Sequence, residues 1–302
     1  MSKHVATHPG ALQRLLKNPK AIAAIAVLGF IIVLAVAGPW LLPYAPETTT
    51  SAKVTPPSAA HWFGTDLNGR DVFSRVLQGA RVSLIVGLCG ALVSFIIGTA
   101  YGLISGYVGG RTDNVMMRLV EVLHSVPRLI IIIVAIFTFA PRLELYLYVH
   151  FESMKGYAKV ILIILSLGLI EWLSMARIVR GQVLALKEQQ FVLAARALGQ
   201  SHTRILLRHL LPNLIGVVVV YLTLTIPAVI LDESFLSFLG LGINDPQASW
   251  GSLLSDGKNA INPVRSYWWL LVFPACAMSL TLLSLNFLGD ALRDALDPRA
   301  RR

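Results

Sequence analysis

Long apolar runs alternate with shorter polar segments along the chain. Six runs are long enough to cross a membrane as helices, which takes about 20 predominantly apolar residues. They cover residues 21–42, 82–107, 115–140, 158–178, 214–231 and 268–288. The first half of the third run is polar, and Pro127 is expected to kink it. The pattern predicts an all-α membrane protein with six transmembrane helices.

One polar interruption, residues 187–213, separates the fourth run from the fifth. Its first half has apolar residues at helical spacing, namely Phe191, Val192, Ala195 and Leu198. We expect Gly199 to end this helix in a left-handed turn. Ser201 is expected to cap a second short helix, and Pro212 to stop it. The segment is therefore predicted to be a pair of short helices between two spans.

Composition and charge fix the class and the orientation. The 302 residues are 55% hydrophobic and only 14% charged, whereas a soluble domain carries about 25% charged residues. Fifteen Lys and Arg residues lie in segments 1–20, 108–114, 177–213 and 290–302, against seven in 43–80, 141–157 and 237–266. The net charge of +10 thus reflects topology, not nucleic-acid binding, and both termini are expected in the cytoplasm. The first run has a basic lead but no small-residue cleavage site, so we expect it to remain as an anchor.

A stripe of small residues follows one face of the second run. Its members recur at every fourth position: Gly90, Ser94, Gly98, Gly102, Gly106 and Gly110. Such a stripe lets helix backbones approach closely in lipid. Packing within this chain is the favoured interpretation, and packing against a second subunit is the alternative.

Several ionisable residues fall at predicted membrane depth, where each costs up to about 3 kcal/mol at a helix centre. They are Glu121, His124, Arg128, Glu171, Asp232 and Glu233. Glu121 and His124 share a helix face. These residues either line a water-filled path or form interface positions and structural ion pairs; a proton relay is disfavoured.

The candidate motifs for catalysis and metal binding each lack a required feature. Residues 251–258 have five residues between the glycines where a phosphate loop needs four, and Asn259 replaces the expected Ser or Thr. Residues 66–71 lack the alternation and distal Glu of a calcium loop. Cys89 and Cys276 lie in separate apolar segments. We therefore expect no catalytic residue, no metal site and no enzyme activity, so energy has to come from a partner or an ion gradient.

The 187–213 segment resembles the coupling loop of permease subunits in ATP-driven, binding-protein-dependent (ABC) importers. The resemblance rests on Ala194-Ala195, Gly199 and Leu211-Pro212. Five further stretches are similar to the C-type permease of the peptide/nickel importer family: residues 61–83, 175–182, 233–242, 249–257 and 289–299. Together they cover about residues 15–300. One position departs from the family pattern, because Leu193 stands where the family has Glu.

This resemblance implies the type I importer permease fold in the inner membrane, with both termini cytoplasmic. The chain would then have three parts. Residues 1–80 form a cytoplasmic lead, the first span and a periplasmic loop, residues 81–290 form a five-helix core with coupling loop 187–213, and residues 291–302 form a cytoplasmic tail. The resemblance implies a second, homologous permease as heterodimer partner, two ATPases inside, a periplasmic or lipid-anchored solute-binding protein outside, and surrounding lipid. ATP and Mg would be bound by the ATPases, with no cofactor in this chain.

Individual residues can also be assigned. By the resemblance, ATPase coupling would use Phe191, Ala194, Ala195, Gly199, Leu211 and Pro212. For the periplasmic gate or receptor-docking rim, we name Asp66, Arg70, Asp71, Trp250 and Asp256; the alternative is that these loops merely pack together. Candidate pathway or structural polar residues are Glu121, His124, Asp232 and Glu233.

The expected function is import of oligopeptides or dipeptides by alternating access. Movement of residues 187–213 as a rigid body would tilt the fourth and fifth spans, with Pro227 and Pro274 as flexible points. Nickel or another small solute is the alternative substrate. An ion-coupled carrier using Glu121, His124 and Asp232 is the rival class.

Overall fold

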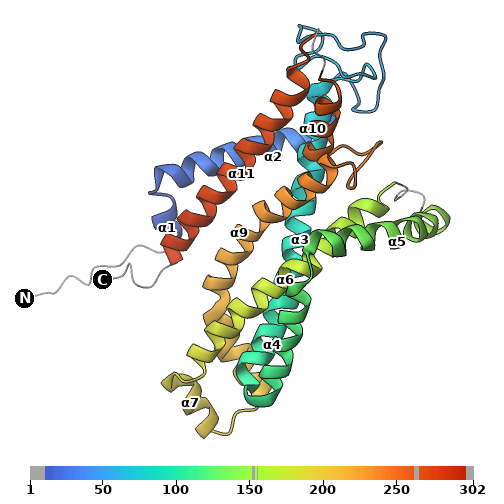
Figure 1. Cartoon of the computed structure of the whole chain (residues 1–302). Helices are drawn as coiled ribbons and strands as arrows, with labels where there is room; N and C mark the ends of the chain where they lie inside the picture. Colours follow the sequence, from blue (N-terminus) through green and yellow to red (C-terminus); the bar gives the residue numbers. More distant parts are fainter. Residues whose placement is uncertain (1–10, 152–153, 155, 262–264, 297–302) are drawn as a thin grey trace, which may run out of the picture.

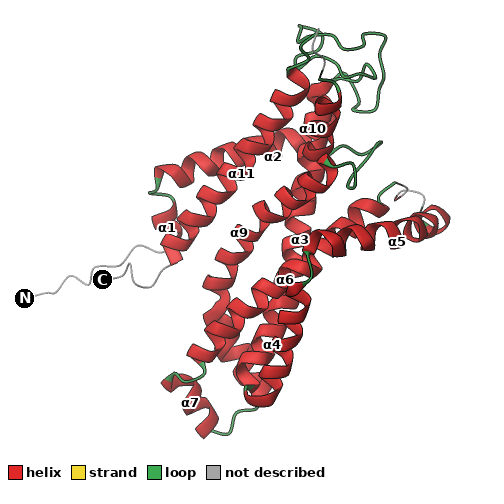
Figure 2. Ribbon diagram, in the orientation of Figure 1, coloured by secondary structure: helices red, strands yellow, loops and turns green. Residues whose placement is uncertain are grey.

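The computed structural model describes residues 11–151, 154, 156–261 and 265–296, and nearly all of the ordered structure in them is helical (Figures 1 and 2). The α-helices are α1 (Ala11–Leu15), α2 (Pro19–Leu41), α3 (Val72–Val108), α4 (Gly110–Ser125), α5 (Arg128–His150), α6 (Ala158–Leu186), α7 (Gln190–Ala197), α8 (His202–Arg204), α9 (Leu211–Phe238), α10 (Trp250–Asn259) and α11 (Trp269–Leu296), with a π-helical segment, η2 (Ile205–Leu210), before α9. This confirms the all-α class.

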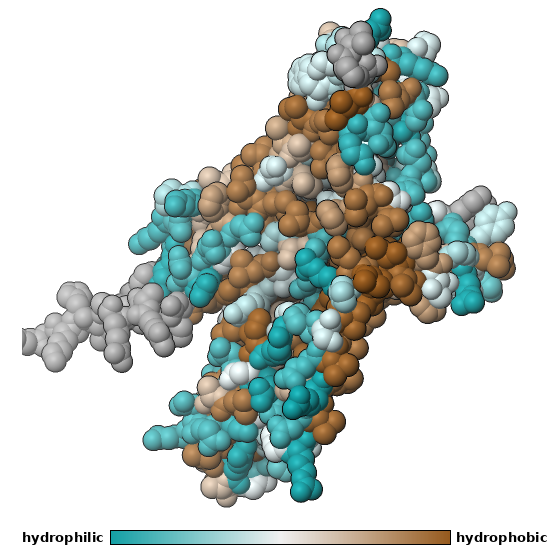
Figure 3. All heavy atoms as spheres, in the orientation of Figure 1, coloured by the Kyte–Doolittle hydropathy of each residue, from teal (hydrophilic) through white to brown (hydrophobic). Residues whose placement is uncertain are grey.

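Six of these helical stretches are long and apolar enough to cross a membrane. They are Pro19–Gly38, Val72–Val108, Arg128–His150, Ala158–Leu186, His202–Phe238 and Trp269–Leu296. On the visible face, hydrophobic side chains cover the middle of the molecule, and hydrophilic side chains gather toward the α7 end (Figure 3). Number and order of the spans therefore agree with the sequence pattern, but most helices are longer than predicted.

The prediction of a single kinked third span over residues 115–140 was wrong. Val126 is extended (φ −79°, ψ 130°), and α5 starts only after Pro127. Proline disfavours the helical conformation in the residue before it, so the chain breaks here instead of bending. The polar half becomes the separate amphipathic helix α4, and the third span runs from Arg128 to His150.

Two segments predicted as loop or tail are also partly helical. Residues 237–266 contain α10, whose first turn is closed by a reciprocal capping box between Ser249 and Ser252. The predicted tail begins inside α11, which continues to Leu296; residues 297–302 lie outside the described residues.

The pair α3 and α6 forms the centre of the molecule, and the glycine stripe of α3 is its contact surface. A Cβ on Gly102 would lie 2.5 Å from the carbonyl oxygen of Ala176, and one on Gly98 would lie 2.6 Å from the Cβ of Met175. Gly106 is equally close to Val183, whereas Gly110 has nothing within 4 Å. The stripe therefore packs within this chain, as favoured, except at its last member.

Helix α4 is held against this pair by a charged contact. Arg180 of α6 donates two hydrogen bonds, each 2.6 Å, to the carboxylate of Asp113, and the Ser105 hydroxyl of α3 also donates to it. The bonds from Arg180 lower the pKa of Asp113; burial opposes this, and the Ser105 bond adds to the lowering. One buried carboxylate thus joins three helices.

The remaining spans flank this centre. Helix α9 packs against α3 and α6, and α11 lies beside α2 and α9 (Figure 1). The short α1 also contacts α11. Helices α7 and α10 lie at opposite ends of the molecule, so the two polar segments that the charge pattern assigns to opposite membrane faces are far apart (Figure 1).

The close approach of α3 and α6 predicts that Gly102→Ala destabilises the protein by about 1–3 kcal/mol, because overpacking forces backbones apart. The measurement is the unfolding midpoint of the purified protein in detergent. Gly181→Ala on α6 is the matched control, since nothing lies within 4 Å of that position; it should be neutral or mildly stabilising. Equal midpoints for both variants would contradict the packing role.

The Asp113 contact predicts acid sensitivity. Because its folded pKa is depressed, Asp113 contributes stability above its ordinary pKa of about 3.9, and this contribution is lost as pH falls through the folded pKa. Asp113→Asn should therefore lower the unfolding midpoint at pH 7, and its difference from wild type should shrink below about pH 4. The exposed Asp294, changed to Asn, serves as control. A pH-independent difference would argue against the ion pair.

Candidate functional site

The α7 end carries an exposed apolar surface on a buried apolar base. Phe191, Leu193 and Leu198 are 40%, 45% and 80% exposed, whereas Val192 and Ala195 are buried. Ala194 is exposed between them. Exposed large apolar side chains on one short helix mark an interaction site. Leu193, where the family has Glu, contributes directly to this apolar character.

The turn after α7 has the predicted geometry. Gly199 has φ +71°, its N–H donates to the Arg196 carbonyl (2.9 Å), and the Gln200 N–H donates to the Ala195 carbonyl (3.1 Å). These two bonds form a Schellman motif, which satisfies carbonyls left free at the helix end.

Two details of the second short helix were predicted wrongly. Ser201 occupies the N-cap position, but its side chain makes no capping bond. Pro212 does not stop a helix, because it lies just after η2 inside the continuous helical stretch His202–Phe238. Between them, η2 joins the pair directly to α9 through a wider π turn, with the Leu211 N–H donating to the Leu206 carbonyl.

Contacts to α3 fix the α7 end in place. The Tyr107 hydroxyl lies 2.8 Å from Nδ1 of His202, and the guanidinium of Arg196 lies 5.2 Å from the centre of the Tyr107 ring. Lys187 donates to the Gly106 carbonyl (3.0 Å). The buried apolar base of α7 and η2 packs with side chains of α3, α6 and α9. The short helices are therefore attached to three spans at once.

At the α10 end, two arginines and three aspartates form one cluster. Arg75 is 2% exposed and binds Asp66 (2.7 Å), Asp245 (3.1 Å) and Asp256 (3.5 Å). Arg70 binds Asp66 (2.7 Å) and Asp245 (2.9 Å). The cluster joins the loop after α2, the start of α3, the 239–249 loop and α10.

The buried Asp66 and the half-buried Asp256 differ in electrostatics. Burial raises the pKa of Asp66, but hydrogen bonds and charge from Arg70, with the charge of Arg75, outweigh it and lower the pKa overall. Burial raises the pKa of Asp256, and the more distant Arg75 offsets this only in part. Asp66 is therefore the central anion of the cluster.

The two other residues assigned to this rim point inward. Asp71 caps α3 by accepting from the Ser74 N–H (2.9 Å), and it also contacts His61 (2.9 Å). Trp250 is 0% exposed, and its backbone N–H donates to the Ser83 hydroxyl (3.3 Å). A receptor at the surface would not touch Trp250, so its role is to position α10 against α3.

The polar residues at membrane depth separate into groups. Arg128 binds Asp232 (3.0 Å) and lies 3.6 Å from Glu171. With Ser166 and Ser174, Arg128 and Glu171 line a cavity of about 580 Å³. One Asp232 oxygen has no hydrogen-bond partner among the described residues. This group is an ion-paired cluster beside a cavity with mixed polar and apolar walls.

His124 lines the same cavity and contacts Arg177 (3.2 Å). Glu121 does not join the group, because it is exposed and lies 3.6 Å from Arg118. Glu233 is 0% exposed and accepts hydrogen bonds from Ser83, Ser234 and Ser237, so it is a structural centre between α3 and α9.

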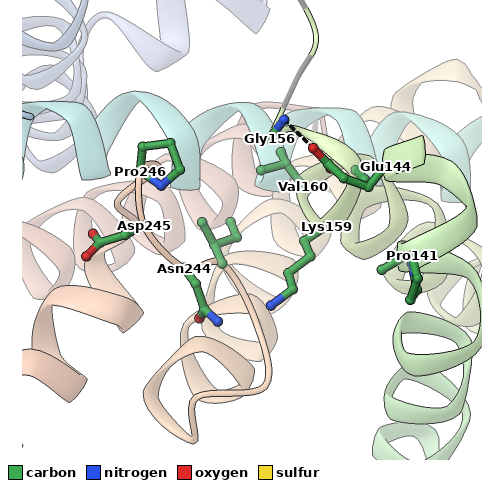
Figure 4. A pocket seen from close by; sticks show the side chains of 11 residues that line it. Pro141, Glu144, Gly156, Lys159, Val160, Asn244, Asp245 and Pro246 are labelled. Carbon is green, nitrogen blue, oxygen red and sulfur yellow. Dashed lines mark hydrogen bonds between the residues drawn. The ribbon is translucent and has the colours of Figure 1, made fainter. Parts of the chain in front are cut away.

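A second concave site lies between the α5–α6 junction and the 239–249 loop (Figure 4). Its volume is about 600 Å³. Pro141, Val160 and Pro246 supply apolar walls, and Lys159 and Asn244 point toward one another across it (Figure 4). No part of the sequence pattern indicated this site.

The sequence reading missed four residues that carry the ionic contacts: Arg75, Asp245, Asp113 and Arg180. Arg75 and Asp245 are 170 residues apart, and no local spacing pairs them. Arg75 and Arg180 lie outside the predicted spans 82–107 and 158–178, so they were counted as loop residues. Only the greater length of α3 and α6 places them inside helices, where a charged residue requires a partner.

Comparisons with known proteins identify the family. Residues 98–302 match the family described as binding-protein-dependent transport system inner membrane component, and residues 10–57 match the N-terminal transmembrane domain of oligopeptide transport permease C. A dipeptide transport system permease protein of Bacillus subtilis is 46% identical over 97% of this chain and 86% of its own length. Oligopeptide transport system permease proteins of Haemophilus influenzae and Escherichia coli K12 are each 45% identical over 96% of this chain, and over 88% and 91% of their own lengths. The chain therefore belongs to the binding-protein-dependent transport system inner membrane components, as a permease subunit of the C type located in the inner membrane.

Proposed function

We propose that this permease imports oligopeptides or dipeptides by alternating access, driven by ATPase subunits that bind at α7. The observation that carries the proposal is the exposed apolar surface of Phe191, Leu193 and Leu198 on a helix fixed to α3, α6 and α9. A force applied at this surface reaches three spans without passing through a flexible loop. The names of the relatives support a peptide substrate.

The ATPase contact is proposed to be mainly apolar. With Leu193 in place of Glu, the α7 surface offers apolar side chains and the small Ala194, flanked by the cation of Arg196. ATP and Mg are proposed to bind in the ATPases, and this chain would carry no cofactor and no catalytic residue. Gly199 and Pro212 set the turn and the entry into α9.

A second, homologous permease is proposed to cover α5. This helix projects to one side of the molecule (Figure 1), and many of its apolar side chains are exposed. They include Val134, Phe137, Phe139, Leu145 and Val149. The cavity with Arg128 and Glu171 opens beside the start of α5, so pairing there would enclose a path between two subunits.

The α10 end is proposed to receive the solute-binding protein. Its charged cluster ties α10, α3 and the 239–249 loop into one unit, so a receptor bound there would act on the unit as a whole. Pro227 and Pro274 lie inside α9 and α11 and are proposed as the points where these helices bend.

Charge at α7 provides the test. Ala194→Glu should reduce peptide-stimulated ATPase activity and uptake at least tenfold in proteoliposomes, because a carboxylate would be desolvated in an apolar contact. Ala194→Ser is the matched control and should retain activity. Membrane levels of both should equal wild type, since Ala194 is exposed. Normal uptake by Ala194→Glu, or wild-type uptake that survives ATP depletion, would overturn the proposal.

A further inference from the structure

We propose that the Lys159 cavity at the α10 end is a carboxylate-binding subsite that takes the C-terminal carboxylate of the peptide before it enters the path. This inference rests on the proposed peptide-import function. It concerns the cavity of about 600 Å³ drawn in Figure 4, whose size suits a few amino-acid residues of a ligand.

The first argument is the uncompensated charge of Lys159. Its ammonium is half-buried, and no carboxylate among the described residues lies within ion-pair distance of it. Its contact is the side-chain oxygen of Asn244 at 3.0 Å, in the amide orientation in which the Asn244 nitrogen donates to the Ile243 carbonyl (3.0 Å). Asn244 thus positions the ammonium and leaves donors free for a ligand.

The second argument is that both described acids lining the cavity are engaged elsewhere. Glu144 accepts from the Gly156 N–H at 2.7 Å (Figure 4). Asp245 is bound by Arg70 (2.9 Å) and Arg75 (3.1 Å). Neither carboxylate neutralises Lys159, which is the one cation among the described residues that line the cavity.

The third argument concerns the walls. Ala140, Pro141, Val160, Ile243 and Pro246 surround Lys159 with apolar surface. A less polar environment strengthens an ion pair formed inside it. Walls of this kind accept side chains of different shapes, while the ammonium binds the carboxylate that every peptide with a free C-terminus carries. Chemically, the site fits a carboxylate next to a variable residue.

The connection to transport is geometric. Asn244 and Asp245 belong to the 239–249 loop, which joins α9 to α10, and Lys159 lies in the first turn of α6. A carboxylate bound to Lys159 would therefore lie between the start of α6 and the end of α9. These two helices also carry Glu171 and Asp232, the acids paired with Arg128 beside the cavity of about 580 Å³.

The test compares trialanine with trialanine amide, which lacks the carboxylate. The transporter is purified with its partner subunits and receptor, and ATP-dependent uptake is measured in proteoliposomes. In Lys159→Gln the KM for trialanine should rise about tenfold with kcat unchanged, as expected for loss of one charge-assisted bond. Uptake of the amide should not change. Lys159→Arg should keep most of the wild-type preference for trialanine over trialanine amide. Lys53 is an exposed lysine at the same end, and Lys53→Gln should behave as wild type.

The outcomes separate the two levels of the proposal. No ATP-dependent uptake of either peptide by wild type would overturn the peptide-import function itself. If the wild type takes up peptide, two results for Lys159→Gln would overturn the subsite alone. Uptake equal to wild type would give Lys159 no role, and equal impairment for trialanine and its amide would assign Lys159 to receptor docking.

Discussion

The close contact between α3 and α6 is the constraint on which the rest of the structure depends. In lipid, apolar side chains gain little by leaving their surroundings, so helix association relies on close packing. Gly98, Gly102 and Gly106 supply it by letting the α6 backbone approach where any Cβ would collide. Because of this contact, Arg180 of α6 comes close enough to bind Asp113, and α4 is held in place. Helix α9 then packs against both.

Helix α3 also connects the two ends of the molecule. It has 37 residues, which at a rise of 1.5 Å per residue gives a length of about 55 Å. Arg75 near its start is the centre of the ionic cluster at α10, and Tyr107 near its end contacts His202 and Arg196 beside α7. A single continuous helix therefore has one of the two proposed docking regions at each end, with no loop between them.

Much of the fold could be predicted because the bilayer imposes a simple length rule on apolar runs. The six spans, the turn at Gly199 and the internal packing of the glycine stripe follow from it and from local backbone chemistry. The break at Pro127 was missed because hydropathy alone does not distinguish a kinked span from an amphipathic helix followed by a shorter one. The helix of α10 was missed because its Ser-based capping box lacks the usual Glu or Gln.

The candidate sites were less accessible to sequence reasoning. Residues 187–213 could be recognised because their geometry is local. The cluster around Arg75 and the cavity around Lys159 are formed by segments distant in sequence, which no spacing rule brings together. Trp250 illustrates the opposite error: an aromatic residue in a polar loop looks like a surface anchor, yet here it is enclosed between helices.

The π-helical segment η2 has a consequence for the evolution of this subunit. A π turn holds one more residue than the α-helix it interrupts, and in α-helical geometry one residue corresponds to a rotation of about 100°. Because the π turn takes up that extra residue, deleting one residue within Ile205–Leu210 would let the segment return to an α-helix with α7 close to its present direction, whereas inserting a further residue would turn α7 about the axis of α9. Lineages of this permease would then tolerate a one-residue deletion in η2 more readily than an insertion, and engineered fusions between coupling loops of different permeases would have to respect this asymmetry.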